Sequence, residues 1–312
     1  MADSDQHRRA TFADRLADLV EARESQIVLG LDPDPMRLWP DALALVPADG
    51  SPVQRAAAAV RAHCAALIDA AGPACVAVKP QLACFERLGA DGWAALAATV
   101  AHARERGLLV LADAKRGDIS VSAAAYAQAL VGSTPTPFGE VEGLRADAFT
   151  ANPLLGVDAL APLVDGARAA GAGVFVLVRT SNPGAADIED LVLAGHSGGD
   201  GDGGTVWERL AQIVARLGGP PGRSGLTDIG AVVGATAPEH VARMRELMPH
   251  TPFLLPGIGA QGGRVEDMAP AFAPGRAGGL VSASRSGGPA STGRAPTGPP
   301  SAGPAPTRRA VA

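Results

Sequence analysis

Short apolar runs alternate along the chain with longer Ala- and Leu-rich segments in which apolar residues recur at helical spacing. This alternation is typical of repeated strand and helix units around a parallel sheet. The apolar runs predict eight strands, at Ile27–Leu31, Cys75–Lys79, Leu108–Asp113, Ala146–Thr150, Gly173–Val178, Gly230–Val233, Pro252–Leu255 and Gly279–Ala283. The segments between them predict helices at Pro52–Ala71, Asp91–Arg106, Ser120–Val131, Val157–Ala170, Thr205–Leu217 and Pro238–Met248.

One further helix is expected near Phe12–Arg23, before the first strand. Eight parallel strands with intervening helices favour an α/β protein of the closed (β/α)₈ TIM-barrel class over an open doubly wound sheet. Residues 286–312 contain five Gly, six Pro and no acidic residue, without apolar periodicity. This composition predicts a disordered Gly/Pro-rich tail. We therefore expect a barrel domain over residues 1–285 and a low-complexity tail over residues 286–312.

Charge and cysteine content narrow the classes of function. The net charge is −5, from 27 Lys and Arg against 32 Asp and Glu, and there is no Lys/Arg-rich run, which argues against nucleic-acid and anionic-membrane partners. Cys64, Cys75 and Cys84 form no Cys-x-x-Cys pair and suit a reducing compartment. The first residues lack an apolar leader, and no apolar run approaches membrane-spanning length. We expect a cytoplasmic protein.

Polar or glycine-rich clusters follow seven of the eight predicted strands. They read GLDPDP, VKPQ, DAKRGD, FTANP, RTSNPG, PGIGAQGG and SASRSGG. In a barrel the carboxyl ends of all strands face one rim, and barrel enzymes place their sites there. Ordinary turn chemistry is the alternative explanation for the Pro, Asp and Gly residues in these clusters.

The most specific cluster lies in VLADAKRGDI. Asp113 and Lys115 are two residues apart on a predicted strand and should project to the same side, while Asp118 lies at the start of the next helix, where the helix dipole favours a carboxylate. A surface ion-pair cluster would also explain this trio. Lys79, at the end of the neighbouring strand, favours a functional site, because lysines and carboxylates converging on one rim create a fixed field for a substrate.

A second cluster, GIGAQGG followed by SASR, ends the seventh and eighth strands and contains Gln261 and Arg285. Glycine-rich backbone beside an arginine at this place in a barrel is typical of a phosphate site. The six histidines show no metal-ligand spacing, and no nucleophile elbow, Walker loop or dinucleotide fingerprint is present. The sequence therefore favours a reaction driven by charged side chains, with no metal and no cofactor.

Taken together, GLDPDP, VAVKPQLACFERLG, LADAKRGDI, DAFTANPLLG, GVFVLVRTSNPGA, GAVVGATAPE and LLPGIGAQGG resemble the motifs of the orotidine 5′-phosphate decarboxylases, specifically the longer bacterial subgroup. The resemblance covers most of the chain from Ile27 to Arg285. It implies decarboxylation of orotidine 5′-phosphate to uridine 5′-phosphate in de novo pyrimidine biosynthesis. It also implies a cofactor-free homodimer with shared active sites.

The resemblance implies a role for each residue that matches the motifs. Lys115 is similar to the general acid that protonates C6 of the pyrimidine. Asp113 is similar to the carboxylate set against the substrate's carboxylate, and Lys79 to the lysine between the sugar and that aspartate. Asp118 and Ile119 match residues that the family contributes to the neighbouring subunit's site, which implies a dimer.

The remaining matches concern substrate binding. Asp32 resembles the aspartate that binds the ribose hydroxyls, and Ser181 the serine that recognises the pyrimidine. Gln261 and Arg285 resemble the phosphate ligands. The segment Ala185–Gly204 is expected to be a mobile lid over the site.

The chain departs from the family after Arg285, where family members continue into an amphipathic helix and this sequence reads SGGPASTGRAPTGPP. Two alternatives to the decarboxylase follow. One is a non-catalytic barrel with a degenerate C-terminus that binds a phosphate ligand. The other is a Mg²⁺-dependent phosphosugar lyase of the same superfamily.

Overall fold

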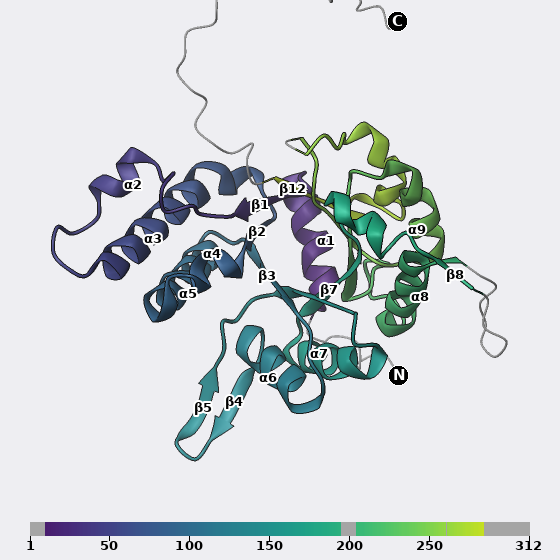
Figure 1. Ribbon diagram of the computed structural model, residues 1–312, viewed down its shortest axis with the longest axis horizontal. Coiled ribbons are helices and arrows are strands. Elements are labelled where there is room, and N and C mark those ends of the chain that lie inside the picture. The colour runs from purple at the N-terminus through teal and green to yellow at the C-terminus, as the bar shows by residue number, and fades with distance from the viewer. Residues whose placement is uncertain (1–9, 195–203, 260, 284–312) are drawn as a thin grey trace, which may run out of the picture.

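A computed structural model describes residues 10–194, 204–259 and 261–283. Within them, eight parallel strands close a barrel in the order β1-β12-β11-β10-β7-β6-β3-β2 (Figure 1). The strands are β1 Ile27–Leu31, β2 Ala77–Pro80, β3 Leu109–Arg116, β6 Ala148–Ala151, β7 Gly173–Arg179, β10 Ile229–Val233, β11 Phe253–Leu255 and β12 Gly279–Ala283. The predicted barrel is confirmed, and each predicted strand is present with boundaries shifted by at most a few residues.

The helices pack around the barrel and confirm the predicted segments. They are α1 Phe12–Arg23, α2 Pro40–Ala44, α3 Pro52–Ala71, α4 Leu82–Glu86, α5 Gly89–Glu105, α6 Ser120–Leu130, α7 Val157–Ala170, α8 Val206–Gly218 and α9 Val241–Leu247. Local sequence fixes several of their starts: Ser51 and Thr205 each form a capping box with a Gln or Glu three residues later. The short helices α2 and α4 were not predicted, because five residues are too few to show a helical period.

The barrel interior and helix α1 share one apolar cluster. Phe12 of α1 packs edge-on against Phe175 of β7, with ring centroids 6.0 Å apart. Glycines make room for these rings, since a Cβ at Gly173 would lie 2.4 Å from Phe12 and a Cβ at Gly230 would lie 2.4 Å from Phe175. Helix α1 therefore closes the amino-terminal end of the barrel, and the carboxyl ends of the strands are left for a site.

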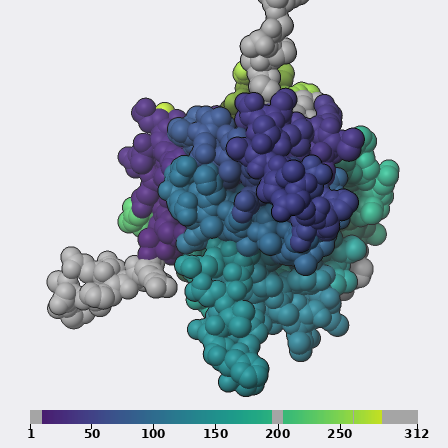
Figure 2. Space-filling view, turned by 90° about the vertical axis from the view of Figure 1, so that its left-hand side faces the viewer, coloured from purple at the N-terminus to yellow at the C-terminus, as the bar shows by residue number. Residues whose placement is uncertain are grey.

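An antiparallel hairpin that the sequence did not predict follows α6. Its strands are β4 Ser133–Thr136 and β5 Gly139–Glu142, and it projects beyond the barrel in both views (Figures 1 and 2). Phe138 at its tip is 99% exposed. Because both faces of this hairpin are largely open to solvent, its residues lack the alternation of apolar and polar positions that marks a half-buried strand.

A two-stranded ribbon of β8 Val192–Leu193 and β9 Gly204–Thr205 pairs the middle of the predicted lid segment with its carboxyl end. Residues 195–203 of that segment, Arg285 and the predicted tail 286–312 lie outside the described residues. Across the described ranges, no helix combines the length and the apolar character needed to cross a membrane.

Candidate active site

A cavity of about 640 Å³ opens at the carboxyl end of the barrel. Its lining residues come from the ends of strands or the loops that follow them. They are Asp32, Lys79, Gln81, Asp113, Lys115, Thr150, Leu177, Thr180, Ser181, Asn182, Glu189, Val232, Leu254, Pro256, Gly257, Ile258, Gln261 and Ser282. The cavity thus collects most of the polar clusters that the sequence places after its strands.

Strand alternation explains why the charged residues enter this cavity. Leu111 of β3 belongs to the interior cluster of the barrel, and Asp113 follows it by two residues. The same spacing relates Ala77 to Lys79 on β2 and Ala148 to Thr150 on β6. Since side chains two apart on a strand project to the same side, these polar groups lie in the next layer above the apolar interior.

The Asp113 carboxylate is the centre of a buried network. Its Oδ2 accepts hydrogen bonds from Lys79 Nζ at 2.7 Å and from Gln81 Nε2 at 3.0 Å. Its Oδ1 accepts from Lys115 Nζ at 2.5 Å and from Thr150 Oγ1 at 3.0 Å. Asp113 and Lys79 are 6% and 7% exposed, whereas the Lys115 side chain is 46% exposed. Lys115 is therefore the cation of this group that is open to a ligand in the cavity.

The network keeps Asp113 ionised. Burial alone would raise its pKa, but the charges and hydrogen bonds of Lys79 and Lys115 outweigh burial and lower the pKa of Asp113 to about 2. The carboxylate is thus paired with two lysines, while two further acidic residues, Asp32 and Glu189, also line the cavity. The partly exposed Lys115 side chain lies at the edge of this group.

The backbone at Lys115 adopts an unusual conformation, with φ of +50°, in the left-handed region that a side chain other than glycine rarely occupies. Its N–H leaves the strand ladder and donates to Thr150 Oγ1 at 2.9 Å. The next residue, Arg116, pairs with Glu86 and lies over the Tyr126 ring, and its carbonyl accepts from Asn152 N–H at 2.8 Å. These contacts hold Lys115 in a conformation that turns its side chain back toward Asp113.

Three other predicted site residues also line the cavity. Asp32 lies directly after β1, Ser181 lies after β7, and Gln261 belongs to the glycine-rich loop after β11. Gly257, at φ of +97°, allows Ser181 and Gln261 to approach each other, because a Cβ there would lie 3.1 Å from Gln261 Oε1 and from Ser181 Cβ. The structure therefore brings Ser181 and Gln261 to the same part of the wall.

Two predicted residues lie apart from this cavity. Asp118 and Ile119, just before α6, are not among its lining residues, and Asp118 Oδ1 accepts from Ile119 N–H at 2.8 Å. Ile119 is 56% exposed. Arg285 lies outside the described residues. Within the described part of one chain, the cavity is thus built without these three.

The sequence analysis missed six polar residues of the cavity: Gln81, Thr150, Thr180, Asn182, Glu189 and Ser282. Gln81 and Thr180 lie within the polar clusters VKPQ and RTSNPG, and Thr150 is in FTANP, so the strand-end position was the available signal. Glu189 lies in the segment interpreted as a lid, and no sequence pattern connects it to the site. In the described residues, no group of three or more His, Cys, Asp or Glu is arranged to hold a metal ion.

A larger groove of about 1470 Å³ lies at the opposite, amino-terminal end of the barrel, and its lining includes Arg15 and Arg168. These arginines serve the fold: Arg15 pairs with Asp147 at 2.5 Å, and Arg168 donates to the Leu217 carbonyl at the end of α8. Cations at helix carboxyl ends offset the helix dipole. We therefore place the candidate site in the smaller cavity, where the Asp113 network lines the wall and the Lys115 side chain is partly exposed.

Comparison with known proteins agrees with this placement. Residues 25–285 match the family model described as Orotidine 5′-phosphate decarboxylase / HUMPS family. The orotidine 5′-phosphate decarboxylase of Deinococcus radiodurans is 41% identical over 278 residues, covering 88% of each chain. The solved OMP decarboxylase of Leishmania donovani superposes with a TM-score of 0.64 at 32% identity, over 88% of this chain and 90% of that one.

The solved UMP synthase of Leishmania donovani is also similar, with a TM-score of 0.66 and 34% identity over 89% of this chain. The match spans 52% of that synthase, about half of its length. The family match extends across the barrel and includes every strand that contributes to the cavity. The chain therefore belongs to the orotidine 5′-phosphate decarboxylase / HUMPS family.

Proposed function

We propose that this chain is an orotidine 5′-phosphate decarboxylase, which converts orotidine 5′-phosphate to uridine 5′-phosphate and CO₂ in de novo pyrimidine biosynthesis. The observation that carries the proposal is the Lys79–Asp113–Lys115 array, buried on one side and open to the cavity at Lys115. Its support from relatives is the 41% identity to a decarboxylase over 88% of both chains.

The reaction breaks the bond between C6 of the pyrimidine and its carboxylate. The bonding electron pair stays on C6, CO₂ leaves, and a proton must then reach C6. In this proposal the Lys115 ammonium first stabilises the charge that develops at C6 and then donates that proton. The neutral amine regains a proton from solvent, so atoms and charges balance over the cycle.

Asp113 and Lys79 prepare Lys115 for this step. The ionised Asp113 carboxylate accepts from Lys115 Nζ at 2.5 Å and so orients the Lys115 side chain. A substrate carboxylate placed against Asp113 meets a like charge, and that repulsion is relieved as CO₂ departs. Lys79 balances the remaining charge of Asp113 and extends the network toward the sugar side of the cavity.

The substrate-binding roles are those that the resemblance to the decarboxylases implies. We assign Asp32 to the ribose hydroxyls, Ser181 to the pyrimidine, and Gln261 together with Arg285 to the phosphate. The glycine-rich loop around Gly257 supports a phosphate at this end, because Gly257 leaves room for the Gln261 side chain, which lines the cavity there. Binding energy from this remote phosphate is then available to the chemical step.

We further propose that the active form is a homodimer, with Asp118 and Ile119 reaching the site of the neighbouring subunit. An exposed apolar surface around these residues supports a second copy of the chain as the partner. Its members lie on the loops after β3 and β6 and in the first turns of α6 and α7: Ile119, Val121, Leu154, Leu155 and Val157 are 56%, 83%, 79%, 51% and 44% exposed. Large apolar side chains gathered at this exposure mark an interaction surface.

Mixing two inactive variants tests the shared site. Lys115→Ala and Asp118→Ala chains should each lack turnover, and together they should regain activity, because each mixed dimer contains one site with both residues intact. Light scattering should give a dimer mass. A monomer, or a mixture without recovered activity while each variant is folded, would contradict the shared site.

A cytoplasmic location fits this proposal. Cys64 and Cys75 are buried as free thiols, and burial raises the pKa of Cys64 to about 12, so these cysteines act as small apolar residues. Free buried thiols suit a reducing compartment.

The decisive experiment follows the loss of orotidine 5′-phosphate absorbance after addition of the purified full-length chain with excess EDTA. Turnover under these conditions supports a metal-independent decarboxylase. Lys115→Ala should abolish turnover and keep binding of uridine 5′-phosphate. Binding without turnover in the parent chain would favour a non-catalytic barrel, and turnover that needs added Mg²⁺ would favour a metal-dependent lyase.

A further inference from the structure

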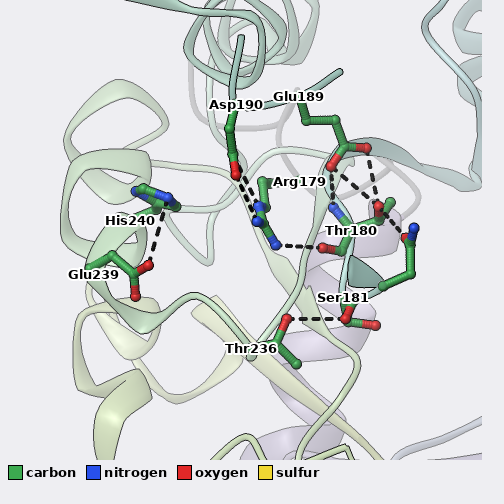
Figure 3. A network of polar contacts seen from close by, with 9 residues as sticks. Arg179, Thr180, Ser181, Glu189, Asp190, Thr236, Glu239 and His240 are labelled. Carbon is green, nitrogen blue, oxygen red and sulfur yellow. Dashed lines mark hydrogen bonds and ion pairs between the residues drawn. The ribbon is translucent and has the colours of Figure 1, made fainter. Parts of the chain in front are cut away.

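Two consecutive acidic residues, Glu189 and Asp190, accept hydrogen bonds from two consecutive residues at the end of β7, Arg179 and Thr180. Asp190 Oδ2 accepts from Arg179 Nη2 at 2.9 Å, and Asp190 Oδ1 accepts from Arg179 Nε at 3.3 Å. The Glu189 carboxylate accepts from the Thr180 backbone N–H at 2.8 Å and lies 3.1 Å from the Thr180 hydroxyl. Figure 3 shows both carboxylates pointing toward the Arg179–Thr180 segment.

The segment that carries these acids is anchored from behind. The Glu189 carbonyl accepts from Trp207 N–H at 2.9 Å, and the Leu191 carbonyl accepts from Val206 N–H at 3.0 Å. These N–H groups belong to the first turn of α8, where no partner exists within the helix. Glu189 is thus attached to a rigid helix on one side and reaches the Thr180 backbone on the other.

The turn Thr180–Asn182 is held from two further directions. Thr236, after β10, donates from its hydroxyl to the Ser181 carbonyl at 3.1 Å (Figure 3). Gly234 packs against the Thr180–Ser181 peptide so closely that a Cβ there would lie 2.7 Å from Ser181 N. All three residues of the turn line the cavity. The turn has no regular secondary structure of its own, and contacts from sequence-distant segments hold it in place as part of the cavity wall.

The pair beneath the turn is ionised and largely shielded from solvent. Hydrogen bonding to Asp190 raises the pKa of Arg179, and hydrogen bonding to Arg179 lowers the pKa of Asp190. Arg179 is 8% exposed and also donates to the Thr180 carbonyl at 3.0 Å. Charge-assisted, two-point contacts of this kind restrict geometry more strongly than neutral hydrogen bonds.

We propose that Glu189 is a positioning residue that fixes the Thr180–Asn182 turn in its cavity-facing conformation, and that the Arg179–Asp190 pair holds the Glu189 segment in reach. The inference rests on the proposed function, in which Ser181 of this turn meets the pyrimidine. A turn that is already ordered loses less conformational entropy when substrate binds. Loosening it therefore weakens binding more than it changes the proton transfer at Lys115.

The test compares Glu189→Ala with Glu189→Gln. Loss of a hydrogen bond to a carboxylate predicts a rise in KM for orotidine 5′-phosphate, and in Kd for uridine 5′-phosphate, of about 10- to 100-fold for Glu189→Ala. We expect kcat to change by less than about 3-fold, since Lys115 and Asp113 are untouched. Glu189→Gln keeps an acceptor for the Thr180 N–H and should restore most of the affinity.

Asp14→Ala is the matched control. The Asp14 carboxylate accepts from the Ser224 N–H at 2.8 Å, which is also a contact from a carboxylate to the backbone of a sequence-distant segment, but Asp14 does not line the cavity. Its loss should lower stability and leave KM and Kd unchanged. Amide hydrogen exchange should accelerate over residues 180–190 in Glu189→Ala and not in Asp14→Ala.

Three outcomes would overturn the proposal. The first two are an unchanged affinity for uridine 5′-phosphate in Glu189→Ala and an unchanged rate of amide exchange over residues 180–190 in the same variant. The third is a Glu189→Gln variant that binds as weakly as Glu189→Ala, which would assign the effect to the charge of Glu189. The test is separable from the proposed function. If the parent chain binds uridine 5′-phosphate without decarboxylating its precursor, the decarboxylase assignment fails, while affinity and exchange still decide the role of Glu189.

Discussion

Replacing Asp113 by Asn should destabilise the fold in a manner that depends on pH. The native contacts of Lys79 and Lys115 lower the pKa of Asp113 from its ordinary value of 3.8 to about 2. That difference corresponds to about 2 kcal/mol of stability contributed by the ionised carboxylate. Because the pKa is depressed in the folded state, this contribution is complete well above pH 3.8 and is lost as the pH falls through about 2.

The Asn variant cannot ionise, so the difference in unfolding free energy between parent and variant should be about 2 kcal/mol at pH 7 and about 1 kcal/mol at pH 3. Urea unfolding followed by circular dichroism at both pH values measures it. Asp69→Asn is the control, because Asp69 pairs with Arg106 at 2.8 Å on the surface, with both side chains nearly half exposed. Exposed pairs contribute less than about 1 kcal/mol.

Two results would refute the reasoning. A parent–variant difference below about 0.5 kcal/mol at pH 7 would mean that the two lysines do not stabilise the carboxylate in the folded state. A difference of full size that persists at pH 3 would mean that it arises from altered packing, since packing does not titrate with Asp113.

Three other substitutions test separate parts of the structure. Thr150→Val keeps the side-chain shape but removes the hydroxyl bonded to Asp113, and should cost about 2 kcal/mol in urea unfolding; an equally stable variant would argue against that bond. Arg245 is 8% exposed, and its guanidinium donates to the carbonyls of Met248, Thr251, Ala271 and Gly278. Arg245→Lys should therefore lower the free energy of unfolding by about 3 kcal/mol or more. A loss under about 1 kcal/mol would contradict this prediction. Gly234→Ala should displace the Thr180–Ser181 peptide and raise KM for orotidine 5′-phosphate at least about 10-fold. A KM at the parent value would show that the turn moves without cost and would contradict the prediction.

Much of the fold was predictable because it depends on local patterns. A parallel strand buried on both faces is a continuous apolar run, and a covering helix has a period near 3.6, so β1, α7 and β12 were located with their observed bounds. The hairpin β4–β5 was not predictable in this way. It contacts little of the core, and its sequence STPTPFGEVE has the prolines and polar residues of a loop.

The same distinction between local patterns and tertiary contacts applies to the residues of the candidate site. Lys79, Asp113 and Lys115 were found because strand alternation and strand-end position place their side chains at the rim of a barrel. Thr150 obeys the same rule two residues beyond Ala148, so a stricter use of alternation would have found it. Its two bonds, to Lys115 N–H and to Asp113, required the neighbouring strand in place.

The sequence by itself determined the class of fold, the end of the barrel that carries the site, and the charged residues at its centre, since each depends on the period or spacing of neighbouring residues. Only the tertiary structure decided that Asp113 is shared by two lysines, that Lys115 adopts a left-handed backbone conformation, and that Glu189 reaches Thr180. Those features arise from contacts between segments far apart along the chain. Packing of the closed barrel, and no local pattern, sets which of these segments meet.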